Sequence, residues 1–212
     1  TDRLLALAVN QDVHMLLGTD AEGNVVAAVA AQEDRGYETD LFRGQNLSVL
    51  PMIQAVLELR TDEYGDKYAG IAKIDDDIVM LTAAPVYDSS GGFVGALAIG
   101  SLMRDVLAQT KQDVLADLTL YQADGQALET TFVLGGGAEL ASLNTTPDNY
   151  RQALFNPTEA TTLGEVTVNR RGYQVAYVPL RIRSETLGVL GVSLPTSFLV
   201  SLITINRSGL SI

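Results

Sequence analysis

The side chains that could carry catalytic or metal chemistry are few in this chain and form no recognisable set. His14, the only histidine, lies in an apolar segment, whereas a catalytic triad or a facial metal site needs further partners. The chain has no cysteine, which excludes disulfides, thiolate nucleophiles and cysteine-based zinc or iron–sulfur sites. The sequence therefore predicts a protein that is not an enzyme and that holds no metal and no cofactor.

Two local motifs resemble chemical sites, but each lacks a required part. Asp75, Asp76 and Asp77 are consecutive acids. A calcium loop needs oxygen ligands at alternating positions and a closing bidentate acid, which the following residues do not supply. The run 135–137 (Gly-Gly-Gly) lacks the Lys-Ser/Thr that completes a phosphate-binding loop. We interpret the first motif as an acidic hairpin tip and the second as a flexible loop.

Composition limits the function classes further. The 212 residues are 47% hydrophobic and 19% charged, which is enough apolar material for two small cores. The formal net charge of −12 argues against nucleic acid and anionic lipid surfaces as partners. No stretch reaches the roughly 20 apolar residues of a membrane span. Because the chain opens within a helical pattern and closes on a polar tail, we expect it to be a piece of a longer protein.

The chain contains one pattern twice. Residues 77–107 and 172–202 both read as an apolar strand, a proline, a polar turn, an apolar strand centred on glycine, and an amphipathic run. A period of about a hundred residues fits two copies of one small domain. The equivalent positions are marked by Pro85 and Pro179, Gly95 and Gly188, and the turn glycines Gly23 and Gly125.

Hydrophobic periodicity predicts the same element order in both copies. In the first copy we expect strands at 13–18, 25–31, 68–74, 78–86 and 93–101, a loop at 32–45, and helices at 48–59 (capped by Ser48) and 102–115. In the second copy we expect strands at 117–121, 127–132, 164–169, 173–179 and 188–194, and helices at 148–155 and 196–205. The predicted fold class is α+β: two tandem PAS-like modules, each with a mostly antiparallel five-stranded sheet and flanking helices.

Short motifs at matching places in the two copies carry a resemblance to a known family. They are Gly44-Gln-Asn-Leu-Ser48 before Pro51, Ala84-Pro-Val-Tyr-Asp88, Gly95-Ala-Leu-Ala-Ile-Gly100, Val178-Pro179 and Leu187-Gly-Val-Leu-Gly191. With these residues, nearly the whole chain resembles the double Cache family. Its members are extracytoplasmic sensor domains of bacterial histidine kinases, chemoreceptors and cyclic-nucleotide signalling enzymes.

The resemblance implies a division of the chain. Residues 1–11 would end a long N-terminal helix, 12–114 would form the membrane-distal module and 115–195 the membrane-proximal module. Residues 196–212 would form a helix that leads toward a transmembrane span. In such modules small ligands usually bind the distal copy, between the sheet and the helix–loop layer.

Five residues of the distal module are candidates for contacting a ligand under this resemblance: Arg60, Tyr64, Tyr68, Lys73 and Tyr87. The Arg60 guanidinium would hold a carboxylate through two parallel hydrogen bonds. The tyrosines would close the pocket with rings and a polar handle. The alternative interpretation is that the two basic residues are solvated and that the tyrosines only pack.

The amino-acid-binding subgroup of the family carries an aromatic pair after the arginine and a later pocket aspartate. Here Arg60 is followed by Thr61 and Asp62, no tryptophan is present, and 95–101 contains no aspartate. This departure argues against an amino-acid ligand. In the proximal module, Arg170, Arg171 and Tyr173 are the residues to examine.

The resemblance predicts a small-molecule-sensing domain of a membrane-bound bacterial signalling protein, in an extracytoplasmic location. Its partners would be a small molecule, with carboxylates among the expected classes, and a second copy in a homodimeric parent receptor. Membrane contact would come only from segments outside this chain. The parent protein would be a histidine kinase, a chemoreceptor or a cyclic-nucleotide enzyme, and the sequence does not identify its output domain. The rival interpretation is a periplasmic protein-docking or spacer module without a ligand. The sequence does not identify the ligand.

Overall fold

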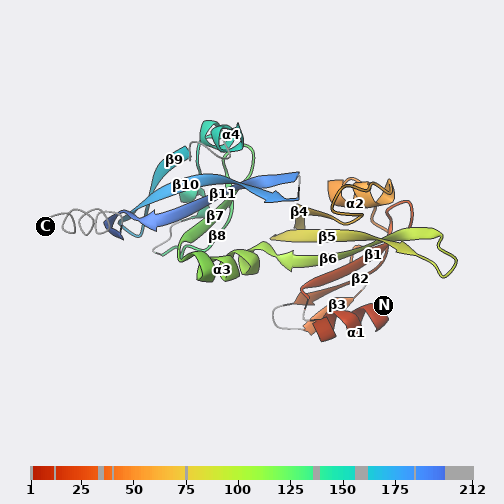
Figure 1. Cartoon of the computed structure of the whole chain (residues 1–212). Helices are drawn as coiled ribbons and strands as arrows, with labels where there is room; N and C mark the ends of the chain where they lie inside the picture. Colours follow the sequence, from red (N-terminus) through yellow and green to blue (C-terminus); the bar gives the residue numbers. More distant parts are fainter. Residues whose placement is uncertain are drawn as a thin grey trace, which may run out of the picture. The chain divides into compact units, whose positions relative to one another are not determined.

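The computed structural model describes residues 2–11, 13–32, 36–39, 41–74, 76–135, 139–155, 162–183 and 185–198 (Figure 1). The chain divides into two compact units, Thr1–Met103 and Arg104–Ile212. Each unit holds one antiparallel sheet with helices packed against it. The predicted α+β class with two tandem modules is therefore confirmed.

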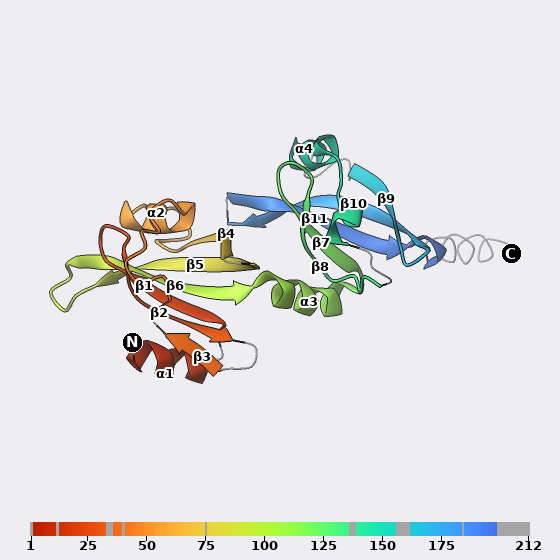
Figure 2. The same cartoon turned by 180° about the vertical axis from the view of Figure 1, so that it is seen from behind.

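The first unit is built on a six-stranded sheet with the order β3-β2-β1-β6-β5-β4. Its elements are α1 (Asp2–Gln11), β1 (Met15–Thr19), β2 (Val25–Gln32), β3 (Gly36–Thr39), α2 (Pro51–Leu57), β4 (Tyr68–Ile74), β5 (Asp77–Tyr87) and β6 (Phe93–Leu102). In two opposite views α1 and α2 lie on opposite sides of this sheet (Figures 1 and 2). The layer of α2 over β4, β5 and β6 is the part that positions the candidate site.

The prediction of five strands in this sheet was wrong by one, because β3 lies inside the segment expected to be a loop. Ala31 of β2 pairs with Tyr37 of β3. The Tyr37 hydroxyl lies 2.9 Å from the carbonyl oxygen of Val13 and 3.3 Å from that of Ala8. One anchoring tyrosine in a short polar stretch produces no alternating pattern, so periodicity could not reveal this strand.

The helix predicted at 48–59 is present as α2, but Ser48 does not cap it. The N-cap residue is Leu50, which makes no side-chain capping hydrogen bond, and Pro51 occupies the first turn. Proline suits this position because its fixed φ matches the helix and its missing N–H would have no intrahelical partner. The Ser48 hydroxyl instead donates to Asn46 Oδ1.

Alanines form half of the buried sheet residues that face α2. Buried alanines from four strands share one core cluster with Met52, Ile53 and Val56 of α2. These alanines are Ala28, Ala30, Ala72, Ala83, Ala96 and Ala98. The opposite face buries Leu16 and Val29 against Ala8 of α1. The first unit therefore has a core on each face of its sheet, and the core under α2 combines alanines with larger side chains such as Leu17 and Leu81.

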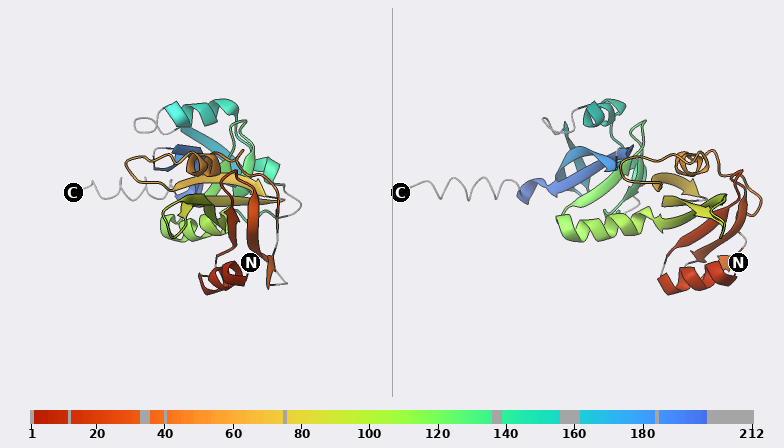
Figure 3. Two further views of the ribbon diagram at one scale, coloured as in Figure 1. Left: turned by 90° about the vertical axis from the view of Figure 1, so that its right-hand side faces the viewer. Right: turned by 45° about the vertical axis from the view of Figure 1, so that its right-hand side comes forward.

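The second unit is built on a five-stranded sheet, as predicted, and its strand order is β8-β7-β11-β10-β9. Its elements are α3 (Met103–Val114), β7 (Asp117–Tyr121), β8 (Ala127–Thr130), a 3₁₀ turn η1 (Leu140–Leu143), α4 (Pro147–Phe155), β9 (Thr162–Val168), β10 (Arg171–Ile182) and β11 (Glu185–Pro195). Within this unit α3 and α4 lie on opposite sides of the sheet (Figure 3). Most of the helix predicted at 196–205 lies outside the described residues.

The units meet at Met103/Arg104, eleven residues before the boundary that the resemblance implied, so nearly all of α3 belongs to the second unit. Lys111 of α3 forms an ion pair with Asp117 at the start of β7, within the second unit.

In both units the segment before the helix is held by a backbone hydrogen bond to a glycine in the first hairpin turn. Gly23 and Gly125 close the first hairpin turns with φ of +87° and +86°. The carbonyl of Gly23 accepts a hydrogen bond from the Leu47 N–H, and the carbonyl of Gly125 accepts one from the Thr145 N–H, both at 2.9 Å. A glycine is needed here because L side chains rarely adopt this left-handed backbone. The duplication therefore extends beyond the C-terminal hairpins to the segments that lead into α2 and α4.

Candidate ligand-binding site

Two hollows lie at the α2 layer of the first unit, one toward each end of the helix. The hollow toward the N-terminal end measures about 230 Å³ and the one toward the C-terminal end about 300 Å³. The first is mostly apolar, with Leu17, Phe42, Leu47, Leu50, Ala72 and Ile74 in its lining beside Gln45 and Lys73. The second combines charged and apolar groups: Arg60, Asp66, Thr61, Val56, Leu59, Gly65, Pro85 and Tyr87.

The end of α2 places Arg60 at the second hollow. Leu59 adopts a left-handed conformation with φ of +52°, and its N–H donates to the Val56 carbonyl. The N–H of Arg60 donates to the Ala55 carbonyl at 3.0 Å. This pair of bonds is a Schellman helix end, which usually has glycine at the left-handed position. A leucine there costs backbone strain, and such strain is often found at functional sites.

The Arg60 guanidinium is already engaged by one neighbour. Its Nε lies 2.7 Å and its Nη2 2.5 Å from Glu58 Oε2. Both side chains are about half exposed, and ion pairs of this kind contribute little stability. A guanidinium has five N–H donors, so Arg60 retains donors for a carboxylate even while it holds Glu58.

The structure brings together two of the five predicted residues and separates the others. Tyr87 lines the same hollow as Arg60, and its ring meets Phe93 edge-on at 6.0 Å. Tyr64 is 58% exposed and lines neither hollow. Tyr68 packs against the core under α2 instead of lining a hollow.

Lys73 lines the other hollow, at the opposite end of α2. Strand alternation directs its side chain away from the face of its neighbours Ala72 and Ile74, which pack toward α2. Of the five candidate ligand contacts, Arg60 and Tyr87 thus line one hollow, Lys73 lines the other, and Tyr64 and Tyr68 line neither.

Sequence reasoning missed Asp66 and Thr61, which share the hollow with Arg60. Both belong to the connector 60–66, whose polar composition gave no periodic pattern to place its side chains. The only sequence feature that could have indicated Asp66 and Thr61 as site residues is their closeness to Arg60 along the chain.

The hairpin tip next to Tyr87 is held by a carboxylate. Asp88 Oδ1 accepts hydrogen bonds from the Ser90 N–H, the Ser90 hydroxyl and the Gly92 N–H at 2.6–2.8 Å. The Ser90 hydroxyl, followed by these backbone donors, holds the pKa of Asp88 below its ordinary value. The Asp88 side chain therefore stabilises the turn that follows Tyr87.

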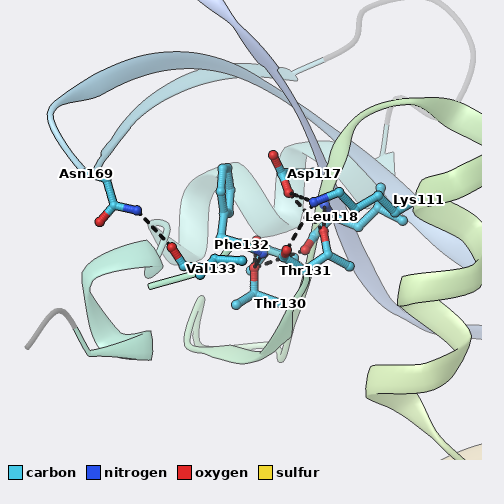
Figure 4. A network of polar contacts seen from close by, with 9 residues as sticks. Lys111, Asp117, Leu118, Thr130, Thr131, Phe132, Val133 and Asn169 are labelled. Carbon is cyan, nitrogen blue, oxygen red and sulfur yellow. Dashed lines mark hydrogen bonds and ion pairs between the residues drawn. The ribbon is translucent and has the colours of Figure 1, made fainter. Parts of the chain in front are cut away.

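The second unit has a hollow of about 660 Å³ beside α3, and Lys111, Asp117 and Thr131 of its lining belong to one network of polar contacts (Figure 4). Lys111 Nζ lies 2.5 Å from Asp117 Oδ1 and 3.3 Å from the Thr131 carbonyl oxygen. The Thr131 hydroxyl donates to the same Asp117 oxygen and accepts from the Leu118 N–H. This network fastens α3 to β7 and to the end of β8, and we interpret it as a structural clamp.

Arg170, Arg171 and Tyr173 do not line that hollow. Arg170 and Arg171 are exposed at the β9–β10 turn. The ring of Tyr173 packs edge-on against Phe132 at 4.9 Å, in a small core cluster.

Two tyrosines fill the core under α4, the place that corresponds to the hollows under α2. The rings of Tyr121 and Tyr177 meet edge-on at 5.6 Å and share a cluster with Ala153 of α4. Burial raises the pKa of the Tyr121 hydroxyl well above its ordinary value, so this group stays neutral. Gly164 and Gly191 make room, since an added methyl group would lie 2.8 Å from a ring carbon of Tyr177 or Tyr121.

The described part of the chain contains no group of three or more His, Asp or Glu side chains that could hold a metal ion. Asp75 lies outside the described residues, Asp76 is exposed, and Asp77 begins β5. Gly136 and Gly137 also lie outside the described residues.

A family model described as the double sensory domain of two-component sensor kinases matches residues 1–199. The chain belongs to the double Cache family. This assigns a sensory role to the tandem modules described above, and it agrees with the resemblance seen in the sequence. A search of curated proteins finds no significant match.

Solved structures show the same fold at low sequence identity. A domain of a sensory box/GGDEF family protein from Vibrio parahaemolyticus has a TM-score of 0.60 at 12% identity, over 94% of this chain and 78% of its own. The extracellular domain of a protein described as histidine kinase vpHK1S-Z8 has a TM-score of 0.59 at 14% identity, over 97% and 77%. The ligand-binding domain of the Campylobacter jejuni chemoreceptor Tlp3, in complex with L-norvaline, has a TM-score of 0.53 at 11% identity, over 92% and 70%.

The chain spans only 32% of the length of an extracellular ligand-binding receptor from Desulfohalobium retbaense, which it also matches. Among the residues that the structure describes, no helix has the length and hydrophobicity of a membrane span.

Proposed function

We propose that the double Cache sensor formed by this chain binds its ligand in the first unit, in the hollow at the C-terminal end of α2. The observation that carries this proposal is a difference between the units. Under α2, a hollow of about 300 Å³ gathers Arg60, Asp66 and Tyr87, whereas the core under α4 is filled by Tyr121 and Tyr177.

The proposed ligand is a small molecule with a carboxylate. Arg60 would bind the carboxylate in place of, or together with, Glu58, because the existing ion pair is exposed and weak. Val56, Leu59 and Pro85 would contact the apolar part of the ligand. The related Tlp3 domain was solved with L-norvaline and the related Pseudomonas fluorescens CtaA domain with L-serine, and both ligands carry a carboxylate.

The proposal extends to the role of the whole protein. The chain would be the extracytoplasmic input domain of a membrane-bound bacterial signalling protein that acts as a homodimer. It would have no enzymatic activity of its own. Ligand binding would shift the receptor between two states only if the ligand has a different affinity for each of them.

A thermal-shift screen with a variant pair tests the proposed site. The panel contains carboxylates, amino acids, amines and sugars. At about 100 times its dissociation constant, a ligand should stabilise the protein by roughly 2.7 kcal/mol, a shift of several degrees. Arg60→Ala should abolish the shift given by carboxylates, and Arg43→Ala should preserve it, because Arg43 is exposed and lines neither hollow.

Two results would contradict the proposal. A shift that survives Arg60→Ala would move the site elsewhere in the chain. The absence of any shift across the panel would favour the protein-docking or spacer interpretation.

A further inference from the structure

We propose that the second unit has a binding site of its own, in the hollow beside α3, for an organic anion with an apolar body. All the residues that line this hollow lie between Arg104 and Pro195, so the site belongs to a single unit. Its volume of about 660 Å³ falls within the range of small-molecule pockets. The proposal is independent of the carboxylate site at Arg60.

One face of α3 forms a wall of the hollow. Arg104, Ala108, Lys111 and Gln112 line it from the helix, and Leu115 lines it from just beyond the helix end. Steps of three or four residues connect these positions, so their side chains lie on one side of the helix. The wall therefore combines two cationic side chains and an amide with two apolar side chains.

Leu115 is held in an unfavourable state in two respects. Its φ of +55° is left-handed, a conformation that glycine usually adopts after a helix, and its N–H donates to the Lys111 carbonyl at 2.9 Å. Its side chain is also 83% exposed, the highest value for a leucine among the described residues. Backbone strain of this kind is often found at functional sites. A ligand that covers Leu115 would remove this apolar side chain from water.

The charged side chains of the lining favour an anion. Arg104 and Lys111 bring two positive charges and Asp117 brings one negative charge, in a chain whose formal net charge is −12. Lys111 Nζ donates to Asp117 and to the Thr131 carbonyl (Figure 4). An ammonium group has three N–H donors, so one remains for a ligand. One negative charge on the ligand would balance the charge of the lining.

The remaining lining favours an apolar body. Four apolar side chains share the hollow: Ala108, Leu115, Ala116 and Pro195. The two threonine hydroxyls of the lining already have partners inside the protein, since that of Thr130 donates to the Leu118 carbonyl and that of Thr131 to Asp117. The charged group of the ligand would therefore contact the basic side chains, and its apolar body would lie against Leu115.

Fluorescence titration with 8-anilinonaphthalene-1-sulfonate, an aromatic anion, tests the site. Leu115→Gly should raise the midpoint of thermal unfolding by about 2–4 °C, because glycine adopts the left-handed backbone without strain. The same substitution should weaken binding of the probe about tenfold, because an apolar contact is lost. A gain in stability together with a loss of affinity separates a binding role of Leu115 from a structural one.

Leu59→Gly is the matched control. Leu59 is the left-handed leucine that follows α2, with φ of +52°, and it lines a hollow of the first unit. Its replacement should raise the unfolding midpoint in the same way and leave the affinity for the probe within about twofold.

A second probe tests the need for a negative charge. N-phenyl-1-naphthylamine has the same rings as the first probe and lacks the sulfonate. Arg104→Gln should weaken binding of the sulfonate about fivefold, because a charged hydrogen-bond donor is lost, and should leave the affinity for the uncharged probe within about twofold. Equal weakening of both probes would overturn the preference for an anion.

An unchanged affinity in Leu115→Gly, or equal weakening by Leu59→Gly, would overturn the site beside α3. The absence of sulfonate binding by the original protein would overturn it as well and would leave the proposed carboxylate site at Arg60 unaffected. If Leu115→Gly gives no cooperative thermal transition, Leu115→Asn replaces it, because asparagine also adopts the left-handed conformation, and it should show the same loss of affinity.

Discussion

The two units share a frame and differ in how they fill the space between sheet and helix. Under α2 the sheet carries six buried alanines and Gly70 among larger side chains such as Leu17 and Leu81, and hollows lie at both ends of the helix. Under α4 the sheet carries Tyr121 and Tyr177, and Gly164 and Gly191 leave room for their rings. The comparison teaches that a duplicated scaffold can retain its turns and hydrogen bonds while its capacity for a ligand is set by a few side-chain volumes.

The largest effect is expected when an aromatic ring is removed from the filled core under α4. Tyr177→Ala should destabilise the second unit by about 3–5 kcal/mol, because it removes a buried ring and leaves a cavity. If the variant still folds, small apolar molecules such as benzene should stabilise it and leave the original protein unchanged. Urea unfolding followed by circular dichroism measures the loss. Tyr64→Ala, at an exposed tyrosine, should change stability by less than about 0.5 kcal/mol. A loss of similar size in both variants would refute the account of the filled core.

The equivalent glycines of the two units should respond unequally to a methyl group. At Gly95, which has φ of +148°, an added Cβ would lie 2.0 Å from the Thr19 carbonyl oxygen. At Gly188 the nearest atom, the Tyr121 carbonyl oxygen, would be 3.1 Å away. Gly95→Ala should therefore cost about 2–3 kcal/mol and Gly188→Ala about 1 kcal/mol of unfolding free energy. Chemical denaturation of both variants measures the difference, and a larger effect at Gly188 would contradict the structure.

Removing the charged contact that fastens α3 should have a moderate effect. Lys111→Met breaks the hydrogen bonds to Asp117 and the Thr131 carbonyl, and it should cost about 1–2 kcal/mol. The matched control is Lys67→Met in the first unit, where the exposed lysine lies 3.5 Å from Asp66 and should contribute less than about 0.5 kcal/mol. Equal losses of thermal stability in the two variants would show that the network in Figure 4 does not fasten the helix.

The smallest expected effect is a pH dependence of the stability that two turns of the first unit contribute. The pKa of Asp20 is lowered chiefly by the Asn24 side chain, and that of Asp88 chiefly by the Ser90 hydroxyl. Because both pKa values lie below the ordinary 3.8, the stability these carboxylates contribute is complete above about that pH. It is lost as the pH falls through the lowered values.

Carbon-13 titration of the two carboxyl groups measures these pKa values. Asn24→Ala should raise the pKa of Asp20 and leave that of Asp88 in place. An Asp20 pKa that does not respond to this substitution would contradict the hydrogen-bond assignment in the first turn.

The repeated frame could be predicted from the sequence because it depends on local signals. The glycine and proline pairs marked the hairpins, and helical spacing marked α2, α3 and α4. The role of Tyr37 was not visible, because one aromatic residue in a polar stretch gives no period. Ser48 misled the prediction of the cap because Pro51 sets the start of α2 instead.

The site was predicted only in part. Arg60 and Tyr87 share a hollow, but Tyr64, Tyr68 and Lys73 do not join them. Strand alternation and the register of β4 beneath α2 decide this, and neither can be derived from residue types alone.

NMR of the tyrosine rings tests the central claim most directly, because Tyr87 lines the proposed site together with Arg60, whereas Tyr64 lines neither hollow. We expect a binding carboxylate to shift the Tyr87 resonances in a saturable way, to leave those of Tyr64 in place, and to lose its effect in Arg60→Ala. Unchanged Tyr87 resonances at saturation, or the same shift in Arg60→Ala, would contradict ligand binding in this hollow.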